Sequence, residues 1–533
     1  MTSVALVAAL AASPASAREA VYASAPGKVS VTVYRDPNRS LGQRIDREWP
    51  RGFAMITETR TVTLPPGEST IRFEGVAEGM VAVSAIVTGL PGGTIEKNRN
   101  ADLLSPASLV DGTLGNRVTI TRTNPATGVA ASEDAIVRTR ADGGIVLQTQ
   151  AGFEAVRCSG LPEKLTFDRV PDGLSAQPVF SIDTRTPAGG TYEVQLTYIS
   201  WGFDWEAHYV ASHTGKDADG RERLRMRSWL TLVNDNGQSF PDAQLLVVAG
   251  ALNIASDFQA LASPPTARPL YLDCYPIGST AAGSAIDVPP PPPPAPPPPM
   301  MAYEADSIVV TGARMSARGL MESPAPIVAQ EENLGDLKLY RVPVAVDVAA
   351  KSMKQVAFLD RDEVKAAFQY RYSCSPWGEN DEASPLAIWL RTKNDRKNGL
   401  GVALPTGGVT LFEQSSRGEQ LVGEPSMRDY AEGRDVELEL GLSPNIFGRC
   451  VKDTKRDPGS RPYPWVTMHT TLTNANRFPV EVRIELGSPA EWKARSKLKG
   501  LALRDGQWSI EQKLAPNSST TIAWDQRSAQ AKD

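Results

Sequence analysis

Hydrophobic and polar residues alternate along most of this chain, and alternation with a period of two is the pattern of β-strands. It is clean over residues 28–34 and 59–64, and a Pro-Pro-Gly turn separates the second segment from residues 69–73. Few windows have the spacing of an amphipathic helix, and no long heptad repeat occurs. We therefore expect an all-β fold with little helix.

The clearest group of strands is expected between residues 192 and 233. Three of its segments alternate: 192–198, 205–211 and 221–233. The loops at 217–220 and 234–237 contain Asx-Gly sequences, which favour hairpin turns. Aspartates in and near these loops raise the question of a calcium site: Asp217, Asp219, Asp235 and Asp242. A calcium loop needs alternating oxygen ligands and a terminal glutamate, which are missing, so we expect turn residues instead.

Further short strands are expected in the C-terminal part of the chain. They cover residues 336–342, 386–390, 408–413, 435–440, 467–472, 480–486, 508–514 and 520–524. Short strands separated by Gly, Pro and Asn are typical of antiparallel β-sandwiches. No internal repeat of fixed period is evident.

A proline-rich segment interrupts this pattern. Between residues 289 and 299 only Ala295 is not proline, and residues 271–334 show no hydrophobic periodicity. Proline fixes φ and lacks a backbone donor, so such a run cannot join a helix or a sheet. We expect a disordered proline-rich insertion that forms a stiff polyproline II rod in its centre.

The chain therefore divides into six parts. These are a signal peptide (1–17), an N-terminal β-rich region (18–185), the first part of a larger β domain (186–270), the insertion (271–334), the continuation of that domain (335–400) and a C-terminal β-sandwich (401–533).

The first residues predict export. Residues 4–12 are apolar, and Ala15-Ser16-Ala17 has the small-x-small form of a secretory cleavage site. No Lys or Arg precedes the apolar run, so a buried N-terminal strand or short helix is the alternative. After removal of residues 1–17 no apolar run approaches the ~20 residues of a membrane-spanning helix.

The net charge bears on the class of partner, and the cysteines bear on metal binding and disulfides. The 56 basic and 61 acidic residues are interspersed and give a net charge of −5, which argues against nucleic acid as a partner. The four cysteines are Cys158, Cys274, Cys374 and Cys450. Their spacing matches no zinc motif, and an even number in an exported chain permits two disulfides in any of three pairings. We expect two disulfides rather than four buried thiols.

Several segments, taken in their order along the chain, resemble the domain-of-unknown-function family 4139. They are residues 197–209 (TYISWGFDWEAHY), 232–245 with Gly250, 335–343 (GDLKLYRVP), 356–360, 404–413 (LPTGGVTLFE), 421–424 and 435–441. The resemblance covers roughly residue 164 to the C-terminus. It implies a β-rich exported or cell-envelope protein without established activity, and it supplies no catalytic residues. Many relatives carry a coiled coil, which this chain lacks.

Standard catalytic motifs are absent, and we expect no cofactor or metal. His208 and His213 could pair with Asp204 around a nucleophile, but the segment reads as a half-buried strand, so we expect structural histidines. The neighbouring aromatic residues could form a sugar-stacking platform, although we expect them in the core: Tyr198, Trp201, Phe203, Trp205 and Tyr209. Arg223, Arg225 and Arg227 share one strand face, where they could grip an anion; we expect a solvated ladder that protects an edge strand.

One short segment of the insertion is a candidate for partner binding. Its residues are Ser307, Ile308, Val309, Val310, Thr311, Gly312, Ala313 and Arg314. The segment resembles the start of the plug domain of TonB-dependent outer-membrane receptors. A β-prone segment on a tether is suited to strand addition onto a partner's sheet, whereas docking on the protein's own sheet edge is the alternative.

Together these features predict a non-enzymatic periplasmic or cell-envelope protein of a Gram-negative bacterium, acting as an interaction or scaffolding module with an envelope protein as partner. The alternative is an exported hydrolase, or a carbohydrate-active or glycan-binding protein, with an unrecognised site.

Overall fold

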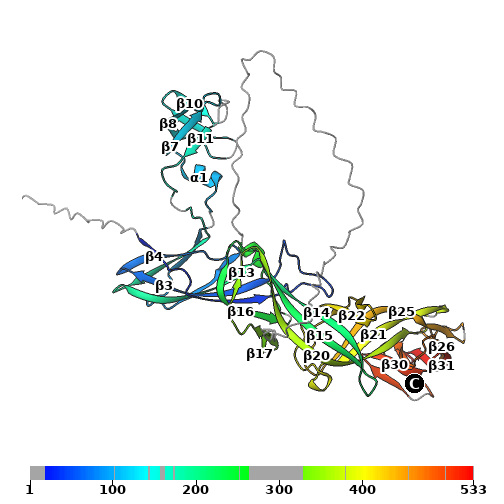
Figure 1. The fold of residues 1–533 in the computed structure, drawn as a ribbon. Coiled ribbons are helices and arrows are strands. Elements are labelled where there is room, and N and C mark those ends of the chain that lie inside the picture. Colours follow the sequence, from blue (N-terminus) through cyan, green and yellow to red (C-terminus); the bar gives the residue numbers. More distant parts are fainter. Residues whose placement is uncertain are drawn as a thin grey trace, which may run out of the picture. The chain divides into compact units, whose positions relative to one another are not determined.

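The computed structural model describes residues 18–100, 103–141, 144–156, 163–171, 174–250, 252–262, 328–378, 380–453, 455–497 and 500–531. The signal peptide predicted at 1–17 lies outside these residues, as does most of the predicted insertion. Strand β17 (Gln330–Leu334) begins within the last part of the predicted insertion and pairs with the strand that follows it. The prediction of an all-β fold built from antiparallel sandwiches is confirmed (Figure 1).

The chain forms two compact units. Of the described residues, the first contains those in 18–99, 180–262 and 328–531, and the second contains those in 100–179. The boundary predicted at 185/186 falls inside the first unit. The reason is that β13 (Gly190–Trp201) pairs along its whole length with β3 (Phe53–Leu64), which joins the N-terminal strands to the later ones.

An eight-stranded sheet forms the N-terminal part of the first unit, in the order β17-β18-β16-β2-β3-β13-β5, with β19 beside β16. Its remaining strands are β2 (Lys28–Tyr34), β5 (Met80–Thr88), β16 (Phe240–Ala249), β18 (Leu337–Arg341) and β19 (Val346–Val348). The short helix α2 (Phe258–Ala262) contacts β5 and β13. A smaller sheet has the order β1-β4-β12-β6, with bounds Glu19–Tyr22, Gly67–Glu74, Val179–Thr186 and Glu96–Asn100.

A 14-stranded sheet forms the rest of the unit. Its main path is β23-β22-β14-β15-β20-β21-β25-β26-β31-β28, and β24, β27, β29 and β30 branch from it. The bounds are β14 (Phe203–Lys216), β15 (Glu222–Asn234), β20 (Ser352–Ser373), β21 (Asn380–Lys393), β22 (Gly407–Ser415), β23 (Gly418–Gly423), β24 (Ser426–Met427), β25 (Asp435–Lys452), β26 (Val466–Asn474), β27 (Val480–Gly487), β28 (Trp492–Arg495), β29 (Leu501–Arg504), β30 (Gln507–Leu514) and β31 (Ser518–Ser528). A single 3₁₀ turn, η1 (Arg396–Asn398), follows β21.

The second unit is a separate five-stranded sheet with its own core. Its order is β10-β9-β8-β7-β11, with bounds Gly152–Ala155, Val146–Thr149, Ala130–Val137, Arg117–Thr123 and Glu163–Thr166. Helix α1 (Pro106–Gly112) begins with a capping box in which Ser105 and Ser108 satisfy each other's backbone N–H groups. Val118, Ile120 and Leu147 lie in the core of this unit.

Two hydrophobic cores stabilise the first unit. The larger one contains side chains of the N-terminal strands and of β14 and β15, and its largest fully buried side chains include Trp205, Tyr209 and Tyr198. The smaller one lies among the C-terminal strands and includes Trp524 and Ile484. Each buried aromatic side chain removes 150–250 Å² from water, so these residues contribute strongly to stability.

A strand-and-turn arrangement occurs twice in the first unit. The first copy contains β14, β15, β16, β19 and β20, and the second contains β25, β26, β27, β30 and β31. Asn234 at the end of β15 lies opposite Ser352, and Asn474 at the end of β26 lies opposite Ser518. In addition, β16 runs parallel to β2, as β27 runs parallel to β20. The sequence shows no fixed period because residues 250–345 separate β16 from β19, whereas residues 488–506 separate β27 from β30.

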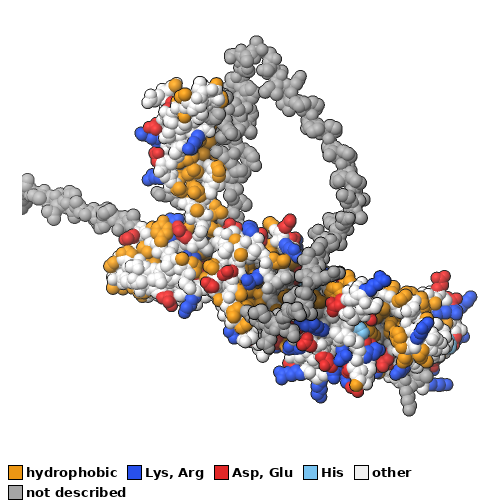
Figure 2. Space-filling view, viewed as in Figure 1, with side chains coloured by type: hydrophobic (Ala, Val, Ile, Leu, Met, Phe, Trp, Pro, Cys, Tyr) orange, Lys and Arg blue, Asp and Glu red, His pale blue; other side chains and the backbone are white. Residues whose placement is uncertain are grey.

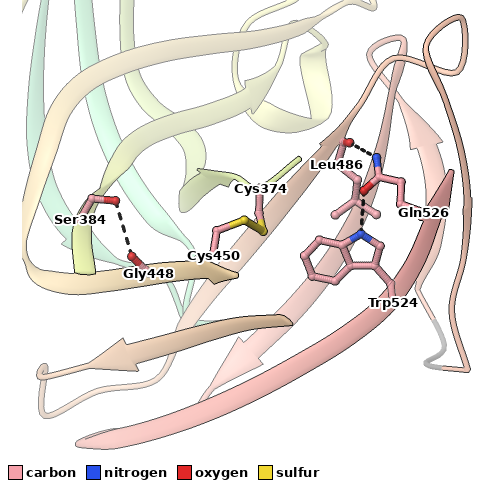
Figure 3. The surroundings of a disulfide bond; sticks show 7 residues. All are labelled: Cys374, Ser384, Gly448, Cys450, Leu486, Trp524 and Gln526. Carbon is pink, nitrogen blue, oxygen red and sulfur yellow. Dashed lines mark hydrogen bonds between the residues drawn. A yellow bond between two sulfur atoms is a disulfide. The ribbon is translucent and has the colours of Figure 1, made fainter. Parts of the chain in front are cut away.

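A disulfide joins Cys374, directly after β20 of the first copy, to Cys450 on β25 of the second copy, and it closes a loop of 76 residues (Figure 3). Both cysteines are fully buried. Trp524 donates its indole N–H to Gln526 Oε1 at 3.0 Å, and the Gln526 amide donates to the carbonyl of Leu486. Cys158 and Cys274 lie outside the described residues.

Candidate functional site

The loop between β2 and β3, residues 35–52, is rich in charged side chains, and we name it the arginine loop. It carries five arginines: Arg35, Arg39, Arg44, Arg47 and Arg51. At its end Gly52 lies so close to the backbone oxygens of Tyr34 and Phe203 that a Cβ atom would be 2.4 and 2.7 Å from them. A side chain does not fit there, so the glycine allows the loop to pack against the start of β14.

A buried ion pair anchors the arginine loop. Arg39 contacts the carboxylate of Asp204 and donates to the carbonyl of Trp205 at 2.9 Å. Asp204 also accepts the backbone N–H groups of Asp36 (3.1 Å) and Trp205 (2.8 Å). The side chains of Arg39 and Asp204 are only 6% and 2% exposed. Burial raises the pKa of Asp204, and the charge of Arg39 opposes this effect.

His208 lies farther along β14. Its Nε2 is 3.1 Å from Thr410 Oγ1 on β22, which runs parallel to β14. Burial lowers the pKa of His208, and the nearby charge of Arg44 lowers it further, so the imidazole is neutral at neutral pH. Within the described part of the chain the hydrogen bonds of Asp204 go to Arg39, Asp36 and Trp205, so this carboxylate does not orient His208.

Between the arginine loop and β22 lies a small polar pocket of about 140 Å³, the arginine-loop pocket. Arg39, Arg44, Glu206 and Glu424 supply its charged lining, and Thr406 and Ser426 supply hydroxyl groups. Glu206 accepts the backbone N–H of Ile45 at 2.9 Å. Contacts of Asp204 and Glu206 thus hold the loop against β14, and the contact between His208 and Thr410 joins β14 to β22.

His213 takes part in a different cluster. Its Nε2 lies 2.8 Å from Glu222 Oε2, and Lys216 Nζ lies 3.0 Å from Glu222 Oε1. Because His208 and His213 are five positions apart on one strand, they face opposite sides of the sheet. The structure does not bring the two histidines and Asp204 around a common nucleophile.

The predicted aromatic cluster forms part of the core. Trp205 donates its indole N–H to the carbonyl of Val248 at 3.2 Å, and the Tyr209 hydroxyl donates to the carbonyl of Pro405 at 2.7 Å. Tyr198 donates to Glu58 Oε1 at 2.8 Å. Phe203 is also fully buried, whereas Trp201 is half-buried. The four buried rings are therefore not available as a sugar-stacking platform.

The predicted arginine ladder on β15 has acidic partners. Arg225 and Arg227 each lie 3.3 Å from a carboxylate on β20, that of Asp362 and that of Asp360. The expectation that the arginines protect an edge strand is wrong, because β15 is paired on both sides, with β14 and with β20. They are half-exposed cross-strand partners of β20 instead.

The aspartates weighed as calcium ligands serve in turns or pairs. Asp217 accepts the backbone N–H groups of Asp219 and Arg221, both at 2.9 Å, which is a hairpin-turn role. Asp235 lies 3.1 Å from Lys351 Nζ. No cluster of three metal-ligating side chains is found among the described residues.

The sequence analysis missed an open sheet edge. Strand β23 ends the 14-stranded sheet, and its side chains Leu421 and Val422 are 57% and 45% exposed. The predicted partner-binding segment, residues 307–314, lies outside the described residues. In the sequence, the feature that points to β23 is the short apolar pair at 421–422. The arginine loop is recognisable in the sequence from its five arginines within 17 residues.

No known family model matches this chain. No curated protein matches it either. Among the helices of the described residues, none is long and apolar enough to cross a membrane.

Proposed function

We propose that this protein is a non-enzymatic interaction or scaffolding protein, which binds an extended segment of a partner protein at the open edge of β23. The exposure of Leu421 and Val422 on this terminal strand carries the proposal. Natural sheet edges are usually blocked by lysine, proline or a covering loop. An extended partner segment gains main-chain hydrogen bonds along β23 and apolar contacts with these two side chains.

The pairing within the arginine-loop pocket supports a structural role for that site. Asp204 is held by Arg39 and two backbone N–H groups, and Glu206 accepts from the backbone of Ile45. In the described part of the chain, the side chain hydrogen-bonded to His208 is that of Thr410, and no third group orients this histidine as the base of a catalytic triad. We therefore assign the pocket to holding β2, β14 and β22 in place.

The proposed location is the periplasm or cell envelope of a Gram-negative bacterium, after removal of residues 1–17. The Cys374–Cys450 disulfide supports this location, since disulfides persist in oxidising compartments. The resemblance to family 4139 supports it as well. Residues 404–413 and 421–424, which carry part of that resemblance, contribute to the pocket and to β23.

Affinity capture with the full-length protein tests the function. The double variant Leu421→Lys/Val422→Lys places two charges on the edge, and we expect it to lose the captured partner. The matched control Leu503→Lys changes a leucine of similar exposure on β29 and should retain the partner. Equal retention by both variants would contradict binding at β23.

Residues 307–314 are a second proposed partner-binding element. Affinity capture from membranes with and without residues 275–334 tests whether the insertion contributes. A peptide of residues 303–318 should bind a periplasmic energy-transducer domain, and no binding at millimolar peptide would eliminate this element.

The alternative function is an exported hydrolase or glycan-binding protein. It is favoured by one observation, that the carboxylates of Glu206 and Glu424 line the same pocket. Hydrolysis of chromogenic esters or glycosides that is abolished by Glu424→Gln would establish it.

A further inference from the structure

The C-terminal strands carry a groove on their outer face, the C-terminal groove, with a volume of about 620 Å³. Its lining includes Thr467 on β26, Thr521 and Asp525 on β31, Arg495 at the end of β28, and Lys497 two residues beyond that end. A volume in this range is typical of ligand sites.

The part of the chain that forms this groove is basic. Residues 441–533 contain fifteen Lys and Arg against nine Asp and Glu, a net charge of +6, although the whole chain carries −5. Figure 2 shows Lys and Arg side chains at the surface of this part of the chain, which is orange to red in Figure 1. Such a charge asymmetry attracts anionic ligands.

Trp465 holds two of these cations in place. The guanidinium carbons of Arg495 and Arg527 lie over its ring, at 4.3 and 4.6 Å from the centroid. Cation–π contacts of this kind orient a guanidinium without neutralising its charge. Arg495 is thereby held at the wall of the groove with part of its side chain in solvent.

The acidic residue of the groove is already hydrogen-bonded on both oxygens. Asp525 Oδ1 accepts from the Thr467 hydroxyl and Oδ2 accepts from Arg495 Nε, both at 2.9 Å. Arg495 uses Nε for this contact, and its side chain is 59% exposed where it lines the groove. Lys497 is exposed beside it.

We propose that the C-terminal groove binds an acidic polysaccharide. Carboxylate groups of the glycan pair with Arg495 and Lys497, and its hydroxyl groups bond to the side chains of Thr521 and Asp525. This ligand fits better than single-stranded nucleic acid. Bases need an open aromatic face for stacking, whereas two guanidiniums lie over Trp465. The inference is independent of partner binding at β23.

Titration calorimetry with the full-length protein tests this proposal. The probes are polygalacturonate, neutral dextran and a single-stranded oligonucleotide. Polygalacturonate should bind, more weakly as salt is raised to about 0.15 M, and dextran should not. Lys497→Glu and Arg495→Gln should each weaken binding by about tenfold, the effect of losing one charge-assisted hydrogen bond.

Two control variants make the same changes of charge elsewhere in the C-terminal strands. Lys513→Glu alters an exposed residue on β30, and Arg477→Gln alters an exposed loop residue, so both should bind as the unchanged protein does. The proposal fails if polygalacturonate does not bind at millimolar sugar, if the controls weaken binding as much as the groove variants, or if the oligonucleotide binds as tightly as polygalacturonate.

Discussion

Asn234 and Asn474 occupy equivalent positions in the two copies of the repeated strand-and-turn arrangement. Asn234 Nδ2 donates to the carbonyls of Gln238 and Ala349, both at 3.0 Å. Asn474 Nδ2 donates to the carbonyls of Phe478 (3.0 Å) and Ala515 (2.9 Å). In each copy the asparagine Oδ1 also accepts the backbone N–H two residues later, at 3.0 Å. One side chain thus satisfies three backbone groups at each turn.

Replacing either asparagine should destabilise its own copy. Asn234→Ala or Asn474→Ala leaves buried backbone groups without partners, and we expect a loss of about 1–3 kcal/mol in the free energy of unfolding. Urea unfolding followed by tryptophan fluorescence measures the loss. Asn333→Ala, at an exposed position of β17, is the control and should change stability by less than about 0.5 kcal/mol. Equal effects of all three would contradict the role of the paired turns.

The Cys374–Cys450 bond should stabilise the C-terminal strands. Closing a loop of 76 residues lowers the entropy of the unfolded chain, which corresponds to about 4 kcal/mol in the chain-entropy model. Cys374→Ala/Cys450→Ala should unfold at lower urea concentration than the oxidised protein. Urea unfolding of the reduced, unsubstituted protein serves as a second comparison, because this protein lacks the bond but keeps both sulfur atoms. An unchanged midpoint in both would contradict this prediction.

The buried pair Arg39–Asp204 predicts a pH-dependent stability. Arg39→Met leaves Asp204 as an unpaired buried carboxylate, and we expect a loss of about 3–5 kcal/mol at neutral pH. The pKa of Asp204 is already raised by burial, and loss of Arg39 raises it further. The folded state then binds a proton more readily than the unfolded state, so the stability of the variant relative to the unchanged protein increases as the pH falls.

Urea unfolding of Arg39→Met at neutral pH and at about pH 5 measures this dependence. The double variant Arg39→Met/Asp204→Asn lacks the titrating group and should show the same deficit at both pH values. If the loss of unfolding free energy in Arg39→Met became larger as the pH falls, the pH dependence would have the opposite sign and would contradict a raised pKa of Asp204.

The environment of His208 predicts a low pKa. Burial is the main cause of the lowering and Arg44 adds to it, so Arg44→Gln should move the pKa of His208 partly back toward 6.5. The chain has only three histidines, so NMR titration of the imidazole signals can follow each one. His469→Gln and His213→Gln identify the His208 signal. A pKa that does not move in Arg44→Gln would contradict the contact.

Strand positions followed from local alternation, but strand pairing did not. The segments predicted at 192–198, 205–211 and 221–233 correspond to β13, β14 and β15. Alternation identifies the face that each side chain occupies, yet it holds no information about partners distant in sequence. The parallel pairing of β14 with β22 joins residues about 200 positions apart. The prediction that the arginines of residues 223–227 protect an edge strand was wrong for this reason.

The candidate site shows the same limit. His208 and Asp204 were visible as neighbours on one strand, but the residue that pairs with Asp204 comes from the arginine loop, 165 positions earlier. Asn234 was visible only as part of the turn signal at 234–237, and Asn474 was not singled out, since residues 250–345 of the first copy have no counterpart of similar length in the second. The openness of β23 depends on the order of strands in the finished sheet, which local sequence does not encode.

Site-specific photo-cross-linking tests the proposed binding at β23 most directly. A photoreactive residue in place of Leu421 in the full-length protein, used with an envelope fraction, should yield one discrete cross-linked partner. That product should disappear when Val422→Lys is added. The same photoreactive residue in place of Phe478, which is exposed to a similar extent in a loop, should not yield it. Identical cross-linked products from positions 421 and 478, or none from either, would contradict the account.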